Sequence, residues 1–483
     1  MSDLFPSLVP AFAAIRQALW RALRCCGRGI KKSARIVVLY LLPLFIVVHL
    51  IATAITGAQL RSTIEDLESK GIILPAEELI PSVPPGEDNA ADLYLAAAKA
   101  LRLSDDESAL LFSPEDRDAH YYAVARDVVP ANEGYYRLLD EATDLEHSAF
   151  PTDWSGSPLE VSFSHFAEAR QAARMLTLRA YVAAEDGRPD DALASLRACY
   201  RMADHIQSEP TIISHLVSIA IQGTAGKALE EILCKTAPSP AVAREFADQL
   251  ATIDNTSASV FALKSENALV GLRLFERLRS GEMSLAELTS GMAGTVESRK
   301  QIRRLAFLGA WLRRPLLNAN ERVYLRFMEK QVAGFALPWP DSQQTVDRID
   351  ASLQHARFWS FVAQCITPVF GRAMLSRDRA TASVRAAAIA LSLKAYYADH
   401  GAYPESLSAL EAAGWTLPTD PFGGGPFHYR REGDGFVVWS IGPDMEDDNA
   451  ARDYFTYQEQ TQGDLEARER NPYDYDVIFR CSS

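Results

Sequence analysis

The sequence has little of what would reveal a reaction. Its 483 residues contain no HExxH, GxSxG, P-loop or GxGxxG pattern, so it predicts none of the enzyme or nucleotide sites that carry these motifs. Only six cysteines are present, without CxxC or Cys/His spacing, which argues against a zinc site or a dense disulfide framework. The 26 glycines and 25 prolines are too few for a collagen-like or low-complexity chain. The motifs of the sequence therefore predict no enzyme activity.

Acidic residues are scarce at the N-terminus. The net charge is −14, yet residues 1–60 hold seven Lys or Arg and one acidic residue, Asp3. The rest of the chain is strongly acidic, which argues against nucleic acid as a partner. Because 483 residues exceed what one hydrophobic core usually organises, we expect more than one domain.

Long hydrophobic runs are also rare, and one stands out. Residues 36–56 read IVVLYLLPLFIVVHLIATAIT, carry no formal charge, and would reach about 31 Å as a helix. The basic leader, residues 1–35, precedes this run, so the positive-inside rule places the N-terminus in the cytoplasm. The pattern predicts a single-pass anchor in the cytoplasmic membrane, with an extracytoplasmic C-terminal region. The alternatives are a cleaved signal peptide, for which the leader is long, and a buried soluble helix.

This topology separates the cysteines. Cys25 and Cys26 would face the cytoplasm, whereas four would lie outside, where oxidation is possible: Cys199, Cys234, Cys365 and Cys481. We interpret these four as buried thiols, and the sequence leaves open whether any of them form disulfides.

The chain after the apolar run is predicted to be mainly helical. Residues 57–89 are rich in proline and acidic residues, which predicts a linker, and helical spacing of apolar residues over 90–376 predicts a helical domain. One hairpin, with Gly187 at its turn, resembles a tetratricopeptide repeat, and that resemblance implies a peptide-binding groove. A generic antiparallel hairpin is the alternative, because no second copy follows.

Two histidine and carboxylate pairs are the candidates for catalysis. His165 and Glu168 form an HxxE pattern on one helical face, and Asp204 directly precedes His205. Such isolated pairs arise by chance in a helical protein of this size. They are the basis of an alternative function, an extracytoplasmic hydrolase or metal enzyme.

The pattern changes after Asp378. A long helix is expected to end at Gly401 and Pro404, and β-like runs follow at 427–432, 435–442 and 475–479. The first two runs are joined by a Gly-Asp-Gly turn, which suits a hairpin. Residues 378–483 therefore predict an α+β module, a long helix packed on a small antiparallel sheet.

Three stretches of this module, GAYPESLSAL, PTDPFGGGPFHYR and DGFVVWSIGPDMEDD, resemble the globular domain of the type II secretion major pseudopilin. The residues that match its motifs are Gly401, Tyr403, Pro404, Asp420, Pro421, Phe422, Gly423, Pro426, Ser440, Gly442 and Asp444. The whole chain is also similar to uncharacterised membrane-anchored envelope proteins of planctomycete-like bacteria.

The pseudopilin resemblance implies a calcium ion in the loop after the last of these motifs. Clustered carboxylates and backbone carbonyls are the oxygen ligands that calcium requires. We expect Asp444 and Asp448 to be side-chain ligands, with Asp447 as the substitute. A solvated acidic turn is the alternative interpretation.

Together these patterns favour a membrane-anchored scaffold over a catalyst. We expect the helical region and the pseudopilin-like module to bind other envelope proteins, and the resemblance connects them with secretion or pilus-like machinery. The lipid bilayer is the other expected partner.

Overall fold

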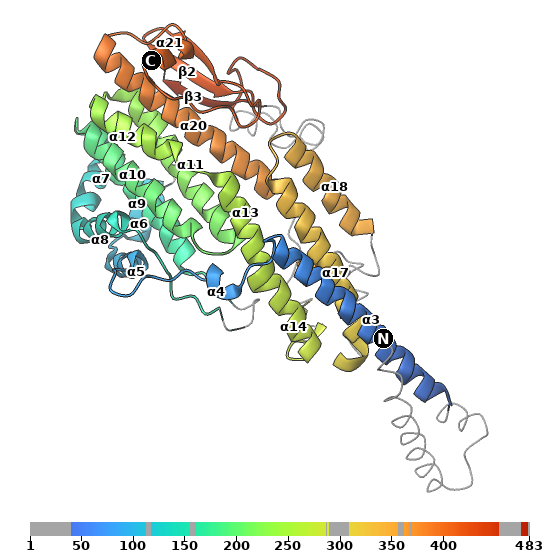
Figure 1. Cartoon of the computed structure of the whole chain (residues 1–483). Helices are drawn as coiled ribbons and strands as arrows, with labels where there is room; N and C mark the ends of the chain where they lie inside the picture. The colour runs from blue at the N-terminus through green and yellow to red at the C-terminus, as the bar shows by residue number, and fades with distance from the viewer. Residues whose placement is uncertain are drawn as a thin grey trace. The chain divides into compact units, whose positions relative to one another are not determined.

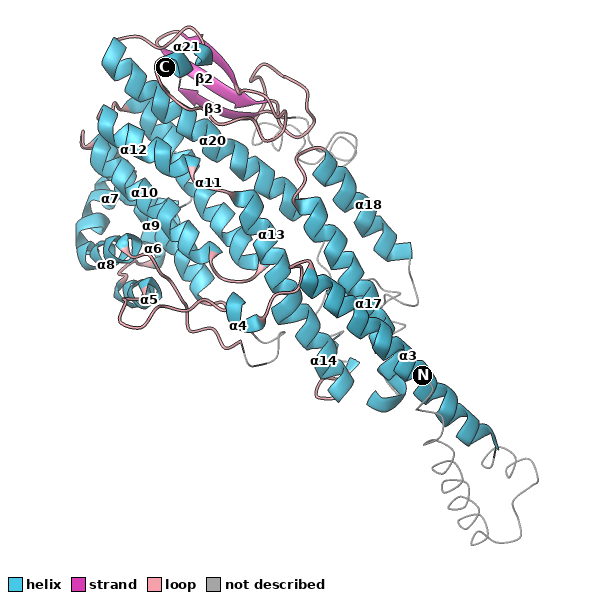
Figure 2. Ribbon diagram, in the orientation of Figure 1, coloured by secondary structure: helices cyan, strands magenta, loops and turns pink. Residues whose placement is uncertain are grey.

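The structure, a computed structural model, describes residues 40–112, 117–154, 156, 161–285, 287–288, 309–355, 362–366, 370–453 and 475–481. Within these residues the chain is mainly helical and ends in a small antiparallel sheet, as predicted (Figures 1 and 2). The basic leader and the first residues of the predicted membrane segment, 36–39, lie outside the described residues.

The chain divides into two compact units. Unit 1 comprises Met1–Gly71, Leu274–Arg326 and Leu353–Thr367, and unit 2 comprises Ile72–Arg273, Phe327–Ser352 and Pro368–Ser483. The described helices are α3 (Leu42–Ser69), α4 (Ala76–Leu79), α5 (Ala90–Ala100), α6 (Asp105–Phe112), α7 (Ala119–Ala131), α8 (Glu133–Asp144), α9 (His165–Glu185), α10 (Pro189–Gln207), α11 (Ile212–Lys235), α12 (Pro240–Ala251), α13 (Asn255–Glu266), the π-helix η2 (Asn267–Leu272), α14 (Arg273–Ser280), α17 (Ala310–Phe335), α18 (Asp341–His355), α19 (Ala363–Ile366), α20 (Phe370–His400) and α21 (Leu407–Ala412); the strands are β1 (His428–Glu432), β2 (Gly435–Ser440) and β3 (Val477–Cys481).

In unit 1, α3 is long and apolar enough to be a membrane span or a signal sequence, and among the described helices it alone meets that description. It continues past the apolar run to Ser69, so the first part of the predicted linker is helical. The helix extends this far because Leu60, Thr63 and Leu67 recur at helical spacing and form a buried face. The Asp66 carboxylate also accepts a hydrogen bond from Arg326 of α17, at 2.6 Å.

Unit 2 begins as a stack of antiparallel helices. The turn between α9 and α10 is made by Gly187, whose φ of +73° is the left-handed conformation that glycine adopts without a Cβ clash. Helix α10 packs against α9 and α11, and its apolar face contributes Leu193, Leu196 and Cys199 to the core. The helical structure predicted for this region is therefore present.

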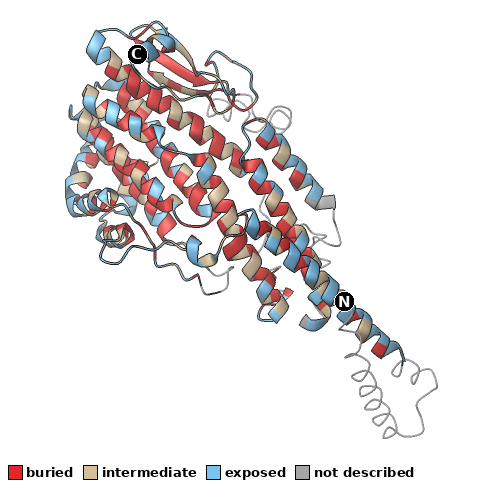
Figure 3. Ribbon diagram, in the orientation of Figure 1, coloured by how far each residue is buried: buried red, intermediate tan, exposed pale blue. Residues whose placement is uncertain are grey.

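Helix α20 joins the two predicted domains. It begins at Phe370, so the expected boundary at 376–378 falls inside a helix. Residues 386–393 of α20 are buried on all sides, because α11 and α12 cover part of the helix and β2 and β3 cover another part (Figure 3). The α+β module therefore shares one hydrophobic core with the helical stack, and both lie in unit 2.

The sheet has the order β1-β2-β3, with both pairs antiparallel. Gly433, with φ of +56°, forms the hairpin turn between β1 and β2. Alternate residues of the sheet, including Phe436, Val438 and Phe479, enter the shared core, while Val437 and Trp439 pack on the opposite face. The expected α+β module, a long helix with a small antiparallel sheet, is formed.

Candidate functional site

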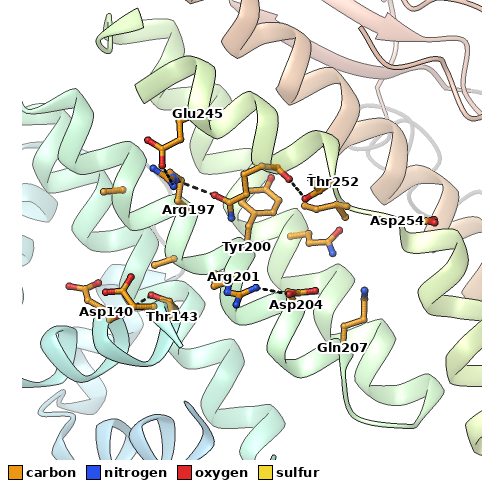
Figure 4. Close-up of a pocket in the computed structure, with 16 residues that line it drawn as sticks. Asp140, Thr143, Arg197, Tyr200, Arg201, Asp204, Gln207, Glu245, Thr252 and Asp254 are labelled. Carbon is orange, nitrogen blue, oxygen red and sulfur yellow. Dashed lines mark hydrogen bonds and ion pairs between the residues drawn. The ribbon is translucent and has the colours of Figure 1, made fainter. Parts of the chain in front are cut away.

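A polar cleft of about 690 Å³ lies in unit 2, between α8, α10 and α12 (Figure 4). Helix α10 lines much of the cleft with one face, on which polar residues recur at intervals of three or four. The lining residues are Asp140, Thr143, Asp144, Ala194, Arg197, Ala198, Tyr200, Arg201, Asp204, Gln207, Gln222, Glu245, Gln249, Thr252, Ile253 and Asp254.

The charges along the cleft are mostly paired. Arg197 bridges to Glu245 at 2.6 Å and donates to the Gln249 side-chain oxygen at 3.1 Å. Arg201 bridges to Asp204 at 3.0 Å. The acidic members of both pairs are more than half exposed, so solvent screens these ion pairs and they exchange partners at low cost.

Tyr200 belongs to the cleft wall and is almost fully buried. Its ring packs edge-on against Phe246, with centroids 5.7 Å apart, and its hydroxyl has no hydrogen-bond partner. Gly226 of α11 leaves space beside that hydroxyl, since a Cβ there would lie 3.4 Å away. Burial raises the pKa of Tyr200, so the phenol stays neutral.

His165, the first residue of the HxxE pattern, lies beside Glu209. Its Nε2 lies 3.2 Å from Oε2 of Glu209, and its ring stacks on Phe150 with centroids 4.1 Å apart. Glu168 is exposed. The cavity beside His165 measures about 20 Å³, which is room for one water molecule and not for a substrate.

His165 and Glu168 line this same small cavity, whereas the side chains of the second candidate pair lie in different environments. The Asp204 carboxylate is exposed and pairs with Arg201, whereas His205 is buried, with Nδ1 2.8 Å from the Tyr94 hydroxyl and Nε2 3.2 Å from the Leu145 carbonyl oxygen. Burial lowers the pKa of His205 to about 4, so the imidazole is neutral at pH 7. Both ring nitrogens are thus engaged in holding α10 to neighbouring segments.

The predicted calcium ligands follow β2. The substitute ligand, Asp447, is engaged: its Oδ1 accepts hydrogen bonds from Trp439 Nε1 and the Asn449 amide, both at 2.8 Å. The Asp444 carboxylate caps its own turn by accepting from the Glu446 amide at 3.1 Å. The Asp448 carboxylate has one buried oxygen, Oδ2, without a hydrogen-bond partner.

Sequence reasoning missed Asp476, which lies beside this loop. It is fully buried, accepts from the Ala450 amide at 2.9 Å, and leaves Oδ1 without a partner. Burial raises the pKa of Asp476 to about 7, and the neighbouring Asp448 acts in the same direction. Among the residues that the structure describes, no group of three or more His, Cys, Asp or Glu side chains is arranged to hold a metal ion.

Gly442, in the middle of the matched Ser440-x-Gly-x-Asp444 motif, is required by this packing. Its φ is +70°, and a Cβ would lie 1.9 Å from the Tyr475 carbonyl oxygen. The segment before β3 therefore passes directly over the end of β2. This close approach places Asp476 next to the acidic loop, and only glycine permits it.

One feature of the sequence, a polar stripe on α10, could have indicated the cleft. Arg197, Arg201 and Asp204 follow each other at intervals of four and three on α10, a polar stripe on a helix whose other face is core. Such a stripe usually marks a solvated surface. Its conversion into a cleft depends on α8 and α12, whose placement the periodicity of α10 does not determine.

We compared the chain with protein-family models, curated proteins and solved structures. No protein-family model matches the chain, and neither a curated protein nor a solved structure matches it.

Proposed function

We propose that this protein is a membrane-anchored extracytoplasmic scaffold that binds other envelope proteins through unit 2. The apolar helix α3 supports the anchor, because it is mostly exposed and is preceded in the sequence by the basic leader. The N-terminus then lies in the cytoplasm, and the chain after α3 lies outside.

The observation that carries the proposal is the polar cleft on α8, α10 and α12. A volume of about 690 Å³ with mainly polar walls suits an extended polypeptide better than a small apolar ligand. Ion pairs such as Arg197 with Glu245 and amides such as Gln249 offer both donors and acceptors. A bound peptide presents the same two kinds of group along its backbone.

The α+β module directs the proposal toward secretion or pilus-like machinery. Its long helix, antiparallel sheet and Gly442 turn agree with the motifs on which the pseudopilin resemblance rests. The module is packed into the core of unit 2, so we propose that it acts as a fixed part of the binding body.

A calcium ion bound after β2 is a further part of the proposal, and it rests on the resemblance. Two buried carboxylate oxygens, Asp448 Oδ2 and Asp476 Oδ1, lack hydrogen-bond partners, and a hard cation would satisfy them. Backbone carbonyls and Asp444 would complete the shell of oxygens.

Photo-crosslinking in intact membranes tests the scaffold function. A photo-reactive amino acid is placed at Thr252, an exposed residue of the cleft, and in a matched control at Thr224, an exposed residue of α11 outside it. We expect one envelope protein to be crosslinked from Thr252 and not from Thr224. Equal products from both positions, or none from Thr252, would refute the assignment of the cleft.

A charge reversal gives the second arm of this test. In Arg197→Glu with Arg201→Glu, both ion pairs of the cleft become repulsive. We expect the crosslink from Thr252 to disappear. The exposed pairs contribute only about 0–1 kcal/mol each, but the variant also loses the hydrogen bond from Arg201 to the Leu145 carbonyl oxygen at 2.9 Å, so its melting temperature is measured to establish that it is folded. An unchanged crosslink in this variant would show that the cleft charges do not bind the partner.

A further inference from the structure

Two cysteines that are 247 residues apart meet in unit 2. Cys234 lies in the last turn of α11 and Cys481 is the last residue of β3, and their Sγ atoms are 2.9 Å apart. The Cys234 thiol also lies 3.0 Å from the Arg480 carbonyl oxygen. The sequence gives no indication of this contact, because each cysteine is isolated in its own segment.

The surrounding fold holds the two sulfur atoms in place. Cys481 is paired with Phe436 in the sheet, and the adjacent Arg480 amide donates to the Glu230 carboxylate at 2.8 Å. Glu230 and Cys234 are one helical turn apart, so β3 is attached to α11 at two successive turns. No rearrangement of either element is needed to bring the thiols together.

The two thiols have different environments. Cys234 is exposed, whereas only 4% of Cys481 is accessible. The hydrogen bond with Cys481 lowers the pKa of Cys234, and the nearby Lys394 ammonium acts in the same direction. Cys234 is therefore the thiol that an external reagent reaches and that ionises more readily, and Cys481 is positioned to attack it in a second step.

We propose that Cys234 and Cys481 form a disulfide that fastens the C-terminal strand to α11. The Cys234 thiolate attacks one sulfur of an external disulfide, a low-molecular-weight or protein disulfide, and displaces one thiolate. Cys481 then loses its proton and attacks the Cys234 sulfur, which displaces the second thiolate. Two protein thiols are oxidised, and the external disulfide is reduced to two thiols.

The matched control is Cys199. It is fully buried on α10, and its Sγ faces the Ala173 carbonyl oxygen at 3.8 Å. Burial raises the pKa of the Cys199 thiol to about 12, which disfavours its reaction. In a chain with six cysteines, this gives a second buried thiol whose replacement by serine leaves the proposed bond intact.

The test uses purified full-length protein in detergent, reduced and then exposed to oxidised glutathione. After the remaining thiols are alkylated, peptide mass spectrometry without reductant should find the Cys234 and Cys481 peptides joined and two hydrogen atoms lighter than their sum. Cys234→Ser and Cys481→Ser should each abolish the joined pair, and Cys199→Ser should retain it. Separate alkylation of both cysteines in the oxidised wild type, or joining of either to another cysteine instead, would overturn the proposal.

A stability measurement provides an independent readout. The bond closes a loop of about half the chain and restricts the unfolded state, so reductant should lower the melting temperature of the oxidised wild type. The same reductant should leave Cys234→Ser and Cys481→Ser unchanged. A reductant-dependent shift of equal size in Cys481→Ser would contradict the assignment.

Discussion

The imidazole of His165 and the carboxylate of Glu209 lie 3.2 Å apart in the interior of unit 2, with 7% and 2% of their side chains exposed. The His165 ring also stacks on Phe150, and truncating a large buried side chain to alanine costs about 3–5 kcal/mol. We expect His165→Ala to lower the free energy of unfolding by about that amount, measured by urea denaturation of the full-length protein in detergent.

The control for this prediction is Glu168→Ala. Glu168 is on the same helix and is exposed, so its truncation should change the free energy of unfolding by no more than about 0.5 kcal/mol. Equal losses in the two variants would mean that the buried His165 side chain does not carry the stability.

A second buried pair predicts a pH effect. Arg377 donates to the Asp378 carboxylate at 2.8 and 2.9 Å and to the Phe335 carbonyl oxygen at 2.7 Å. Burial raises the pKa of Asp378 to about 6, and Arg377 opposes that rise. In Arg377→Met the pKa of Asp378 should rise further. The stability that a raised carboxyl pKa contributes is present at low pH and is lost as the pH rises through the folded pKa.

We therefore expect Arg377→Met to lose about 3–5 kcal/mol at pH 8 and clearly less at pH 5. Denaturation curves at the two pH values measure the difference. Adding Asp378→Asn should restore part of the loss at pH 8, because the unpaired charge is then gone. A loss that is the same at both pH values would contradict this account.

These pairs show what the sequence determines and what it leaves open. The bounds of α9 to α12 follow from apolar residues at helical spacing, because each helix buries one face whatever its neighbour is. The partner of a buried polar group depends on which helices become neighbours. His165 therefore lies beside Glu209, 44 residues along the chain, a neighbour that the local HxxE pattern does not indicate.

The same reasoning explains the missed parts of the candidate sites. Asp476 is an isolated acid in the sequence, and only the passage of the chain over Gly442 brings it to the acidic loop. The boundary expected near residue 377 was placed at a change of pattern, yet α20 runs through it, because both the helical stack and the sheet need its apolar surface. The local pattern of apolar residues shows which face of an element is buried, but it does not show which other element packs on that face.

Glu230 predicts a second pH-dependent effect. Its carboxylate accepts from the Arg480 amide, and burial raises its pKa to about 7. Between about pH 4.5 and pH 7 the folded state thus binds more protons than the unfolded state, so stability falls as the pH rises. Glu230→Gln keeps the acceptor and removes the charge. We expect the variant to be more stable than the wild type at pH 8, by on the order of 2 kcal/mol, and equal to it at pH 4.

The measurement is the melting temperature as a function of pH, with Glu245→Gln as the control. Glu245 is mostly exposed in its pair with Arg197, so its replacement should leave the slope of the curve unchanged. Parallel curves for wild type and Glu230→Gln would show that the Glu230 carboxyl does not titrate as described.

The membrane topology is testable by protease accessibility. The seven basic residues before the apolar run predict a cytoplasmic N-terminus. Protease added to spheroplasts should digest the chain after α3 and spare a tag at the N-terminus. Lysed spheroplasts provide the control, in which both parts should be digested. Protection of unit 2 in intact spheroplasts would reverse the assigned orientation.

The calcium prediction rests on the crowded carboxylates after β2. Asp448 and Asp476 each have a buried oxygen without a hydrogen-bond partner, and their mutual repulsion contributes to the raised pKa of Asp476. A cation that binds only the folded state relieves this repulsion and stabilises the fold by about 2.7 kcal/mol at a hundredfold excess over Kd. Chelator should therefore lower the melting temperature, and added calcium should restore it.

Two variants separate bound calcium from a solvated acidic turn. In Asp444→Ala with Asp448→Ala the ligands predicted from sequence are removed, and we expect the response to calcium to disappear. Asp447→Ala is the matched control, because the Asp447 carboxylate is already held by Trp439 and the Asn449 amide. It should lose some stability and keep the calcium response. Melting curves that are identical in calcium and in chelator for the wild type would reduce the cluster to a turn whose buried Asp476 is held neutral by a proton near pH 7.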